Sequence, residues 1–195
     1  MPSLQRELLS SPKCAVSNTG LMLSVFQSEQ IELLKSLYDR IYIPASELVE
    51  YAKHGAEALI RELLDNGFVV VCELNQIEKE EAKRISEKIA ALPLTKDKIA
   101  QNHYPEAEAM VLASRAELEK PEILLDERAA REVAKARGLS VIGFAGLLIR
   151  VCKAQQLTPE EVREIMLKCV SLGTHYAQEF IENIYRQLQE ERHEP

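Results

Sequence analysis

The chain has 195 residues, of which 46% are hydrophobic and 28% charged, a balance typical of a single globular domain with a substantial core. Its net charge of −7 disfavours broad, non-specific binding to a nucleic-acid backbone, but it leaves room for a local site that holds a polyanion through metal ions. No run approaches the ~18 apolar residues of a membrane span, and residues 1–12 form a polar lead-in without the layout of a signal peptide. We therefore expect a cytoplasmic protein that does not contact a membrane.

The cysteines favour reduced thiols over a zinc site. The four are far apart in the sequence and form no CxxC pair; they are Cys14, Cys72, Cys152 and Cys169. Each has apolar neighbours, so we expect buried thiols in a reducing compartment.

Strands and helices alternate in the first half of the chain. A helical pattern follows the first strand, and Pro44 stops the second. The predicted strands are 14–18, 40–43 and 68–72, and the predicted helices are 20–37, 45–51, 55–64 and 77–92.

The second half continues the alternation and ends in helices. Pro105 suits the first turn of a helix that reaches about residue 118, and Thr158 caps a later helix with Pro159 in its first turn. The remaining predictions are a strand over 123–125, a basic helix from 128, a strand near 141, an apolar helix to 153, and helices over 159–171 and 176–189. This order predicts a three-layer α/β/α sandwich around a mainly parallel sheet over 13–157, with a C-terminal helical hairpin over 158–195 packed on the same domain.

The apolar face of that hairpin has two interpretations. Its residues can pack on the core or on a second subunit, and the sequence does not separate the two; they are Val162, Ile165, Met166, Phe180 and Ile184.

Polar and acidic residues follow the predicted strands. Asn18 ends the first strand, Glu47 and Glu50 follow the second, and Asp126 ends the last long one. Glu106 and Glu108 lie in the first turn of the helix that begins at Pro105. In a parallel sheet these positions meet at the carboxyl edge, where ligands bind. Carboxylates gathered there suit Mg²⁺ or Mn²⁺, and two such ions can activate water for attack on a phosphodiester.

Several of these acids also have an ordinary structural interpretation. Asp126 can serve as a helix N-cap, and Glu127 can pair with Arg131 four residues on. Glu106 and Glu108 point about 200° apart on a helix, so we expect only one, preferably Glu106, to face the site. Glu50 is preferred to Glu47, which is the weaker candidate.

Basic and hydroxyl side chains near these acids are candidate substrate contacts. Arg128, Arg131 and Lys135 form a stripe at helical spacing that is either a solvated face or a phosphate contact. Thr19 can orient a ligand or a water, although a hydroxyl at a strand end is also ordinary turn chemistry. The four histidines show no paired spacing, and we expect them on the surface or in loops.

Four segments in order resemble the motifs of PIN-domain nucleases, in a stand-alone prokaryotic branch described as predicted nucleic-acid-binding proteins. The likeness extends over about residues 13–189, and its motifs are 16–21, 41–44 with Glu50, 105–109, and 124–131 with 138–143. It implies a site with Asp126, Glu50 and Glu106 as catalytic residues, and with Asn18 and Glu108 as further ligands of Mg²⁺ or Mn²⁺. The chain departs from the pattern in having Asn18 where the family has Asp, and Pro105 where it has Gly.

The resemblance implies a metal-dependent endoribonuclease that acts on RNA or single-stranded nucleic acid. The alternative is a catalytically weakened module that binds RNA or a protein partner without cleavage, since Asn18 brings no charge. A homodimer and a small antitoxin-like partner fit the family, but the chain itself does not speak for or against the second. A dinucleotide-binding enzyme is disfavoured because only Gly20 follows the first strand, and an aspartyl phosphatase because Asn18 stands where its nucleophile would be.

Overall fold

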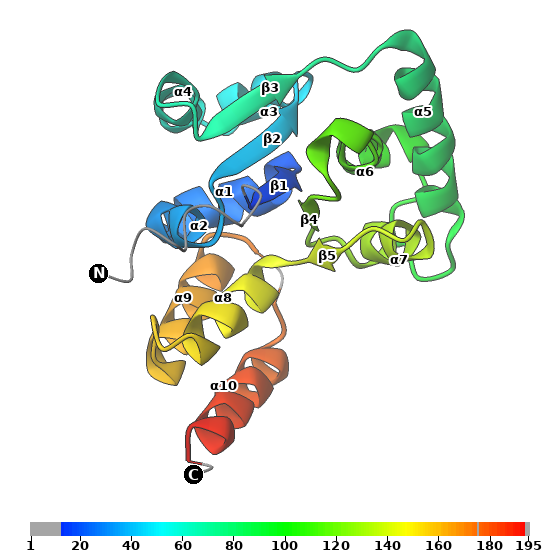
Figure 1. The fold of residues 1–195 in the computed structure, drawn as a ribbon. Coiled ribbons are helices and arrows are strands. Elements are labelled where there is room, and N and C mark those ends of the chain that lie inside the picture. Colours follow the sequence, from blue (N-terminus) through cyan, green and yellow to red (C-terminus); the bar gives the residue numbers. More distant parts are fainter. Residues whose placement is uncertain (1–12, 175, 194–195) are drawn as a thin grey trace.

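The computed structural model of the chain describes residues 13–174 and 176–193 and contains a single parallel sheet (Figure 1). The predicted lead-in over 1–12 lies outside the described residues. The strands are β1 (Cys14–Ser17), β2 (Arg40–Pro44), β3 (Val69–Cys72), β4 (Glu122–Leu124) and β5 (Val141–Ile142).

The order of the strands reverses at the centre of the sheet. The order is β3-β2-β1-β4-β5, and every neighbouring pair is parallel. The chain builds one half outward from β1 and then returns to build the other half from β4. Open parallel sheets bind ligands beyond the carboxyl ends of the strands at this kind of switch point, so Ser17 and Leu124, the last residues of β1 and β4, mark the place to examine.

Helices connect the strands and extend beyond the last one. They are α1 (Thr19–Ser28), α2 (Ile31–Leu37), α3 (Glu47–Lys53), α4 (Glu57–Asp65), α5 (Gln76–Ala91), α6 (Tyr104–Ala113), α7 (Arg128–Ala136), α8 (Phe144–Lys153), α9 (Pro159–Ser171) and α10 (Gln178–His193), with 3₁₀ helices at Ala100–His103 and Ala116–Leu118. Over the described part of the chain, no helix combines the length and the apolar character that a membrane crossing requires.

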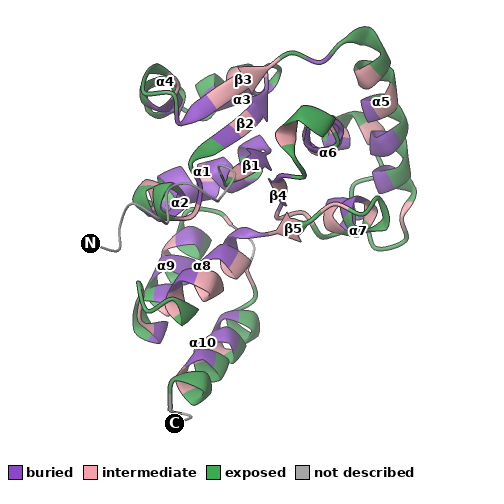
Figure 2. Cartoon of the chain, viewed as in Figure 1, coloured by how far each residue is buried: buried purple, intermediate pink, exposed green. Residues whose placement is uncertain are grey.

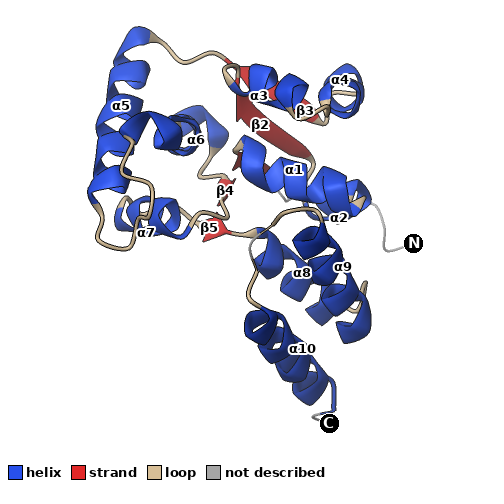
Figure 3. Ribbon diagram, turned by 180° about the vertical axis from the view of Figure 1, so that it is seen from behind, coloured by secondary structure: helices blue, strands red, loops and turns tan. Residues whose placement is uncertain are grey.

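The sheet separates two hydrophobic cores, which makes the fold three-layered. Successive strand residues point to opposite faces, so Ala15 enters the core formed with α1–α4 and α8–α10 whereas Val16 enters the core formed with α5, α6 and α7. Figures 2 and 3 show these helix layers from opposite sides, and the burial colours of Figure 2 place buried residues where the helices meet the strands. The prediction of an α/β/α sandwich with C-terminal helices is confirmed.

The C-terminal helices contribute to the first of these cores. Val162, Met166 and Ile184 are buried in the cluster that contains α1 and α8, whereas Phe180 remains 44% exposed. The apolar face of the hairpin therefore packs largely on the domain itself.

Two predicted helices are shorter than the sequence pattern suggested. The segment 20–37 is divided into α1 and α2 because Glu29 adopts a left-handed conformation with φ 62° and ends α1. The helix that begins near Pro105 ends at Ala113 and is followed by a separate 3₁₀ turn. Neither break contains the glycine or proline that would have marked it in the sequence.

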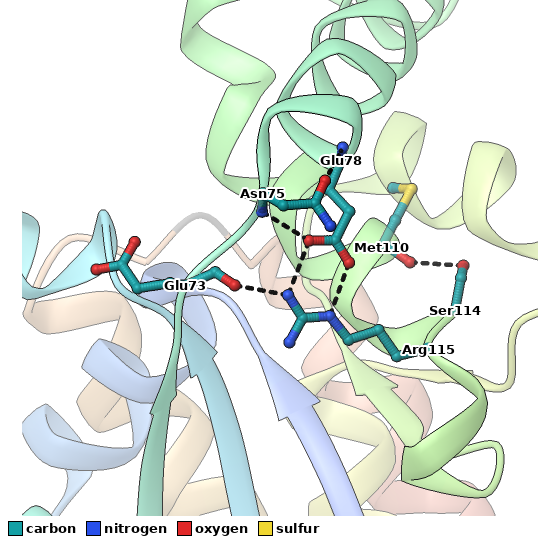
Figure 4. A network of polar contacts seen from close by, with 6 residues as sticks. All are labelled: Glu73, Asn75, Glu78, Met110, Ser114 and Arg115. Carbon is teal, nitrogen blue, oxygen red and sulfur yellow. Dashed lines mark hydrogen bonds and ion pairs between the residues drawn. The ribbon is translucent and has the colours of Figure 1, made fainter.

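Arg115 joins the end of α6 to the start of α5 (Figure 4). Its guanidinium donates two 2.8 Å hydrogen bonds to the Glu78 carboxylate and one of 2.6 Å to the Glu73 carbonyl. Glu78 also accepts from the backbone N–H of Asn75, as part of the capping box of α5. This network fixes α6, the helix that presents Glu106 and Glu108.

Candidate active site

Asn18 connects the end of β1 to α6. Its side-chain oxygen accepts the Leu21 N–H at 3.4 Å and caps α1, and its Nδ2 donates to Glu106 Oε1 at 3.1 Å. The amide therefore supports the Glu106 carboxylate through a donor, which an aspartate could not do. The second Glu106 oxygen, Oε2, is buried and has no hydrogen-bond partner among the described residues.

Glu47 is the most deeply buried acid of the site, with 1% of its surface exposed. Tyr51 donates to Glu47 Oε2 at 3.4 Å, but no described residue donates to Oε1. Burial raises the pKa of Glu47 well above its ordinary value, the nearby Glu106 and Glu108 carboxylates raise it further, and the hydroxyl groups of Thr19 and Tyr51 lower it. Glu47 therefore resists ionisation unless a cation compensates its charge.

Glu106 and Glu108 contact different partners on the two sides of α6. Glu106 meets Asn18, whereas Glu108, 4% exposed, accepts a hydrogen bond from the Ser46 hydroxyl at the start of α3. Both carboxylates raise the pKa of Glu47, so both lie close to it. Burial raises the pKa of each of these two carboxyl groups.

Glu50 lies one helical turn beyond Glu47, at the edge of a cleft. It pairs with Lys53 and is partly exposed, so it takes the more solvated of the two α3 positions. The cleft has a volume of about 480 Å³ and separates α3 from the start of α6; it is lined by Ser46, Glu47, Glu50, Lys53, Gln101, Asn102, Tyr104, Pro105 and Glu108.

Asp126 lies at the carboxyl end of β4 but turns toward α8. Its Oδ1 accepts the Phe144 N–H at 2.8 Å. Asp126 therefore caps α8, the helix that follows the neighbouring strand β5, rather than α7. Burial raises the pKa of Asp126, while the Phe144 N–H and Arg131 lower it. Gly143 makes this contact feasible, because a Cβ there would stand 2.8 Å from Asp126 Oδ1.

Glu127 does not form the expected ion pair with Arg131. It caps α7 instead, accepting the Ala129 N–H at 3.1 Å and the Ala130 N–H at 2.6 Å. The charge of Glu127 also raises the pKa of Glu106, so the two carboxylates lie near one another.

The predicted substrate contacts lie in different environments. Arg128 is exposed at the start of α7, whereas Arg131 is partly buried beside Asp126, and no described residue accepts from its Nε. Thr19 is 7% exposed; its buried hydroxyl lies beside Glu47 and Tyr51 and lowers the pKa of both, although it makes no hydrogen bond of ordinary geometry to a described residue. Lys135 is exposed and lies near Glu132.

Two further residues near the site gave no sequence signal. His103 lies in the 3₁₀ turn before α6 and is 6% exposed; its Nε2 lies 2.9 Å from the Asp97 carbonyl oxygen, and the nearby imidazole lowers the pKa of Glu106. The Tyr176 hydroxyl is buried near Asp126 and has no partner within the described residues. Neither position belongs to a spacing pattern that could have identified it.

The donor set of the site is composed of oxygen atoms. Within residues 13–174 and 176–193, no three His, Cys, Asp or Glu side chains are grouped so that they could hold a metal ion. Three buried oxygens nevertheless lack a hydrogen-bond partner in this part of the chain: Thr19 Oγ1, Glu47 Oε1 and Glu106 Oε2. Oxygen atoms without donors, two of them on carboxylates, fit a hard divalent cation.

Together, the fold and the site define a three-layer parallel α/β protein with buried acids at the switch point of its sheet. The chain belongs to the PIN-domain family, whose model matches residues 14–190. The resemblance found in the sequence motifs is thereby confirmed, and with it a fold generally associated with nucleases, divalent metals and nucleic acids. A search of curated proteins found no match to the chain.

Proposed function

We propose that the chain is a metal-dependent endoribonuclease. The observation that carries this proposal is the pair of buried carboxylate oxygens, on Glu47 and Glu106, that have no donor among the described residues. Leaving buried acceptors unsatisfied costs free energy, about 1–3 kcal/mol each, unless a ligand completes them. Glu47 follows β2 at the carboxyl edge of the sheet, where open parallel sheets bind ligands, and Glu106 lies near enough to raise its pKa.

Glu47 and Glu106 are the residues that would hold Mg²⁺ or Mn²⁺, with Glu108 and the Asn18 carbonyl oxygen as further donors. A bound ion of this kind supplies a Lewis acid that lowers the pKa of water and offsets phosphate charge. Asp126 retains one oxygen beyond its bond to Phe144, and Glu50 stands at the entrance of the cleft.

The basic residues have a different task in this proposal. Arg131 brings a partly buried guanidinium charge beside Asp126, which suits attraction of an RNA phosphate, and the exposed Arg128 provides a second charge on the same helix. Thr19 can orient the substrate or a water beside Glu47.

Cleavage of RNA in Mn²⁺ by the wild type and by Glu106→Gln tests the assignment. We expect the variant to lose roughly 100-fold or more of the activity, because the amide removes a ligand charge while keeping the size of the side chain. Glu87→Gln, an exposed position on α5, is the matched control and should retain full activity. Equal rates for the wild type and Glu106→Gln would contradict the proposal.

The second candidate function is a PIN module that binds RNA or a protein partner without cleavage. Asn18 supports it, because the amide donates to Glu106 and leaves the site with one carboxylate fewer than the family pattern. Calorimetric titration with Mn²⁺ distinguishes the two. Absence of binding at millimolar Mn²⁺, together with binding by Asn18→Asp, would favour the module.

A further inference from the structure

The cleft between α3 and the start of α6 has features of a ligand site in its own right. Its volume is about 480 Å³. One wall is formed by α3 through Glu47, Glu50 and Lys53. The other wall is formed by the segment that leads into α6, through Gln101, Asn102 and Tyr104.

Glu47 connects the inner end of this cleft to the acidic site. The residue is 1% exposed and lines the cleft, and its Oε1 has no donor among the described residues. A buried acceptor without a donor, in a residue that lines a cleft, is a position that a bound ligand or ion can complete. A ligand in the outer part of the cleft would therefore lie next to the candidate reaction centre.

Hydrogen-bond acceptors dominate the outer part of the cleft. Asn102 donates its Nδ2 to Asp97 at 2.7 Å, which leaves its Oδ1 free to accept. Lys53 is engaged by one oxygen of Glu50, so the second oxygen of that carboxylate can accept as well. This excess of acceptors disfavours a phosphate in the cleft and favours a ligand with an amino group.

Tyr104 and Gln101 provide an aromatic ring and a free amide group, which suit a planar ligand with polar edges. The Tyr104 ring is partly exposed: it packs on the core formed with α5, α6 and α7, its hydroxyl lies 3.4 Å from the Lys79 carbonyl, and the residue also lines the cleft. Gln101 is exposed, and no described residue hydrogen-bonds to its amide, so both its donor and its acceptor are available. Unpaired RNA bases are bound by this combination of an aromatic ring and polar groups at the base edge.

We propose that the cleft binds one unpaired RNA base that carries an exocyclic amino group beside a ring nitrogen acceptor, adenine or cytosine. Tyr104 stacks on the base, Asn102 Oδ1 and Glu50 accept from its amino group, and Gln101 pairs with the adjacent ring atoms. Uracil presents carbonyl oxygens where the cleft also presents acceptors, so it binds more weakly. The inference rests on the proposed function for the presence of RNA and adds which base the site selects.

Fluorescence anisotropy with short homopolymers of adenosine, cytidine or uridine tests this preference on the full chain. The measurement is made in Ca²⁺, and gel electrophoresis verifies that the RNA stays intact. We expect the wild type to bind the adenosine and cytidine oligomers about fivefold or more tighter than the uridine oligomer. Gln101→Ala should reduce this preference to below about twofold, and Tyr104→Leu should weaken all three oligomers about fivefold or more.

Gln27→Ala, an exposed position on α1, is the matched control and should keep the wild-type preference. Unchanged thermal unfolding of the variants verifies that they fold. Equal affinity of the wild type for all three oligomers, an unchanged preference in Gln101→Ala, or no binding of any oligomer would overturn the proposal. Binding of an oligo-arginine peptide in place of RNA, lost in Gln101→Ala, would also overturn it and indicate a protein partner.

The experiment separates this proposal from the proposed function. Cleavage of RNA without a base preference overturns the base site and leaves the nuclease. A preference that depends on Gln101, without cleavage in Mn²⁺, supports the base site and contradicts the nuclease.

Discussion

At the scale of single residues, Glu47 shows a conflict between stability and the proposed chemistry. Its carboxyl is buried, shares the field of Glu106 and Glu108, and has one oxygen without a described donor. Such a group destabilises the fold when it ionises, whereas a divalent cation would reverse the effect. The buried, ionised Glu47 carboxylate therefore lowers the stability of the ligand-free protein, and a bound cation would restore that stability.

Glu47→Gln should raise the stability of the metal-free protein at neutral pH. The raised pKa of Glu47 means that its contribution to stability is fully present below the ordinary value of 4.5 and is lost as the pH rises through the higher value in the fold. Glutamine cannot ionise, so this loss should disappear, and each kcal/mol gained raises Tm by roughly 2–4 °C. Thermal unfolding of the wild type and Glu47→Gln at pH 5 and pH 8 measures this gain. A variant that is less stable than the wild type by the same amount at both pH values would contradict the argument.

The sequence predicted the type of these residues better than their orientation. It placed acids after the strands and preferred Glu50 to Glu47, whereas the structure buries Glu47 and leaves Glu50 partly exposed one turn further along the same helix. The direction of Asp126 depends on a Phe144 N–H that is 18 residues away, and no local pattern reports it. Burial of His103 likewise follows from the Asp97 carbonyl rather than from spacing.

At the scale of elements, strand and helix types followed from hydrophobic periodicity, whereas boundaries depended on tertiary contacts. Thr158 and Pro159 identified the start of α9 because a capping box is a local arrangement. Glu29 could not be identified as a helix break, since a left-handed glutamate is disfavoured locally and is retained by the packing of α1 and α2 on the core.

Arg115→Ala tests whether the Arg115–Glu78 clamp, the ion pair that joins the end of α6 to the start of α5, supports the site. Removing its charged hydrogen bonds to Glu78 should cost roughly 1–3 kcal/mol of unfolding free energy at pH 7. Arg115 holds the pKa of Glu78 below its usual value, so the contribution is present above pH 4.5 and is lost as the pH falls through the lower value. Urea denaturation at pH 7 and pH 3.5 should therefore show a smaller difference between the proteins at the acidic value.

Arg61→Ala is the matched control for this comparison, because Arg61 pairs with Glu57 on the exposed surface of α4. We expect it to change stability by about 0.5 kcal/mol or less at either pH. A loss as small in Arg115→Ala as in Arg61→Ala would show that the clamp does not hold α6.

At the scale of the whole molecule, one core extends from the sheet through α1 and α8 to the C-terminal helices. Met166 of α9 is 0% exposed within this cluster, which also contains Leu21 of α1 and Leu147 of α8. A segment that shares its buried surface with the sheet cannot melt without exposing that surface. We therefore expect the hairpin and the α/β part to unfold together.

Met166→Ala and Leu167→Ala provide a matched pair of neighbouring residues of α9, one fully buried and one partly exposed. Met166→Ala should lower the free energy of unfolding by about 2–5 kcal/mol, because it leaves a cavity in the shared core. Leu167 is 36% exposed, so Leu167→Ala should lower it by about 1 kcal/mol or less. Helix content by circular dichroism and tyrosine fluorescence should report one coincident transition, shifted as a whole in Met166→Ala. If that substitution instead divides the unfolding into two steps, the C-terminal helices form a unit whose stability is independent of the sheet, and the acidic edge does not depend on them.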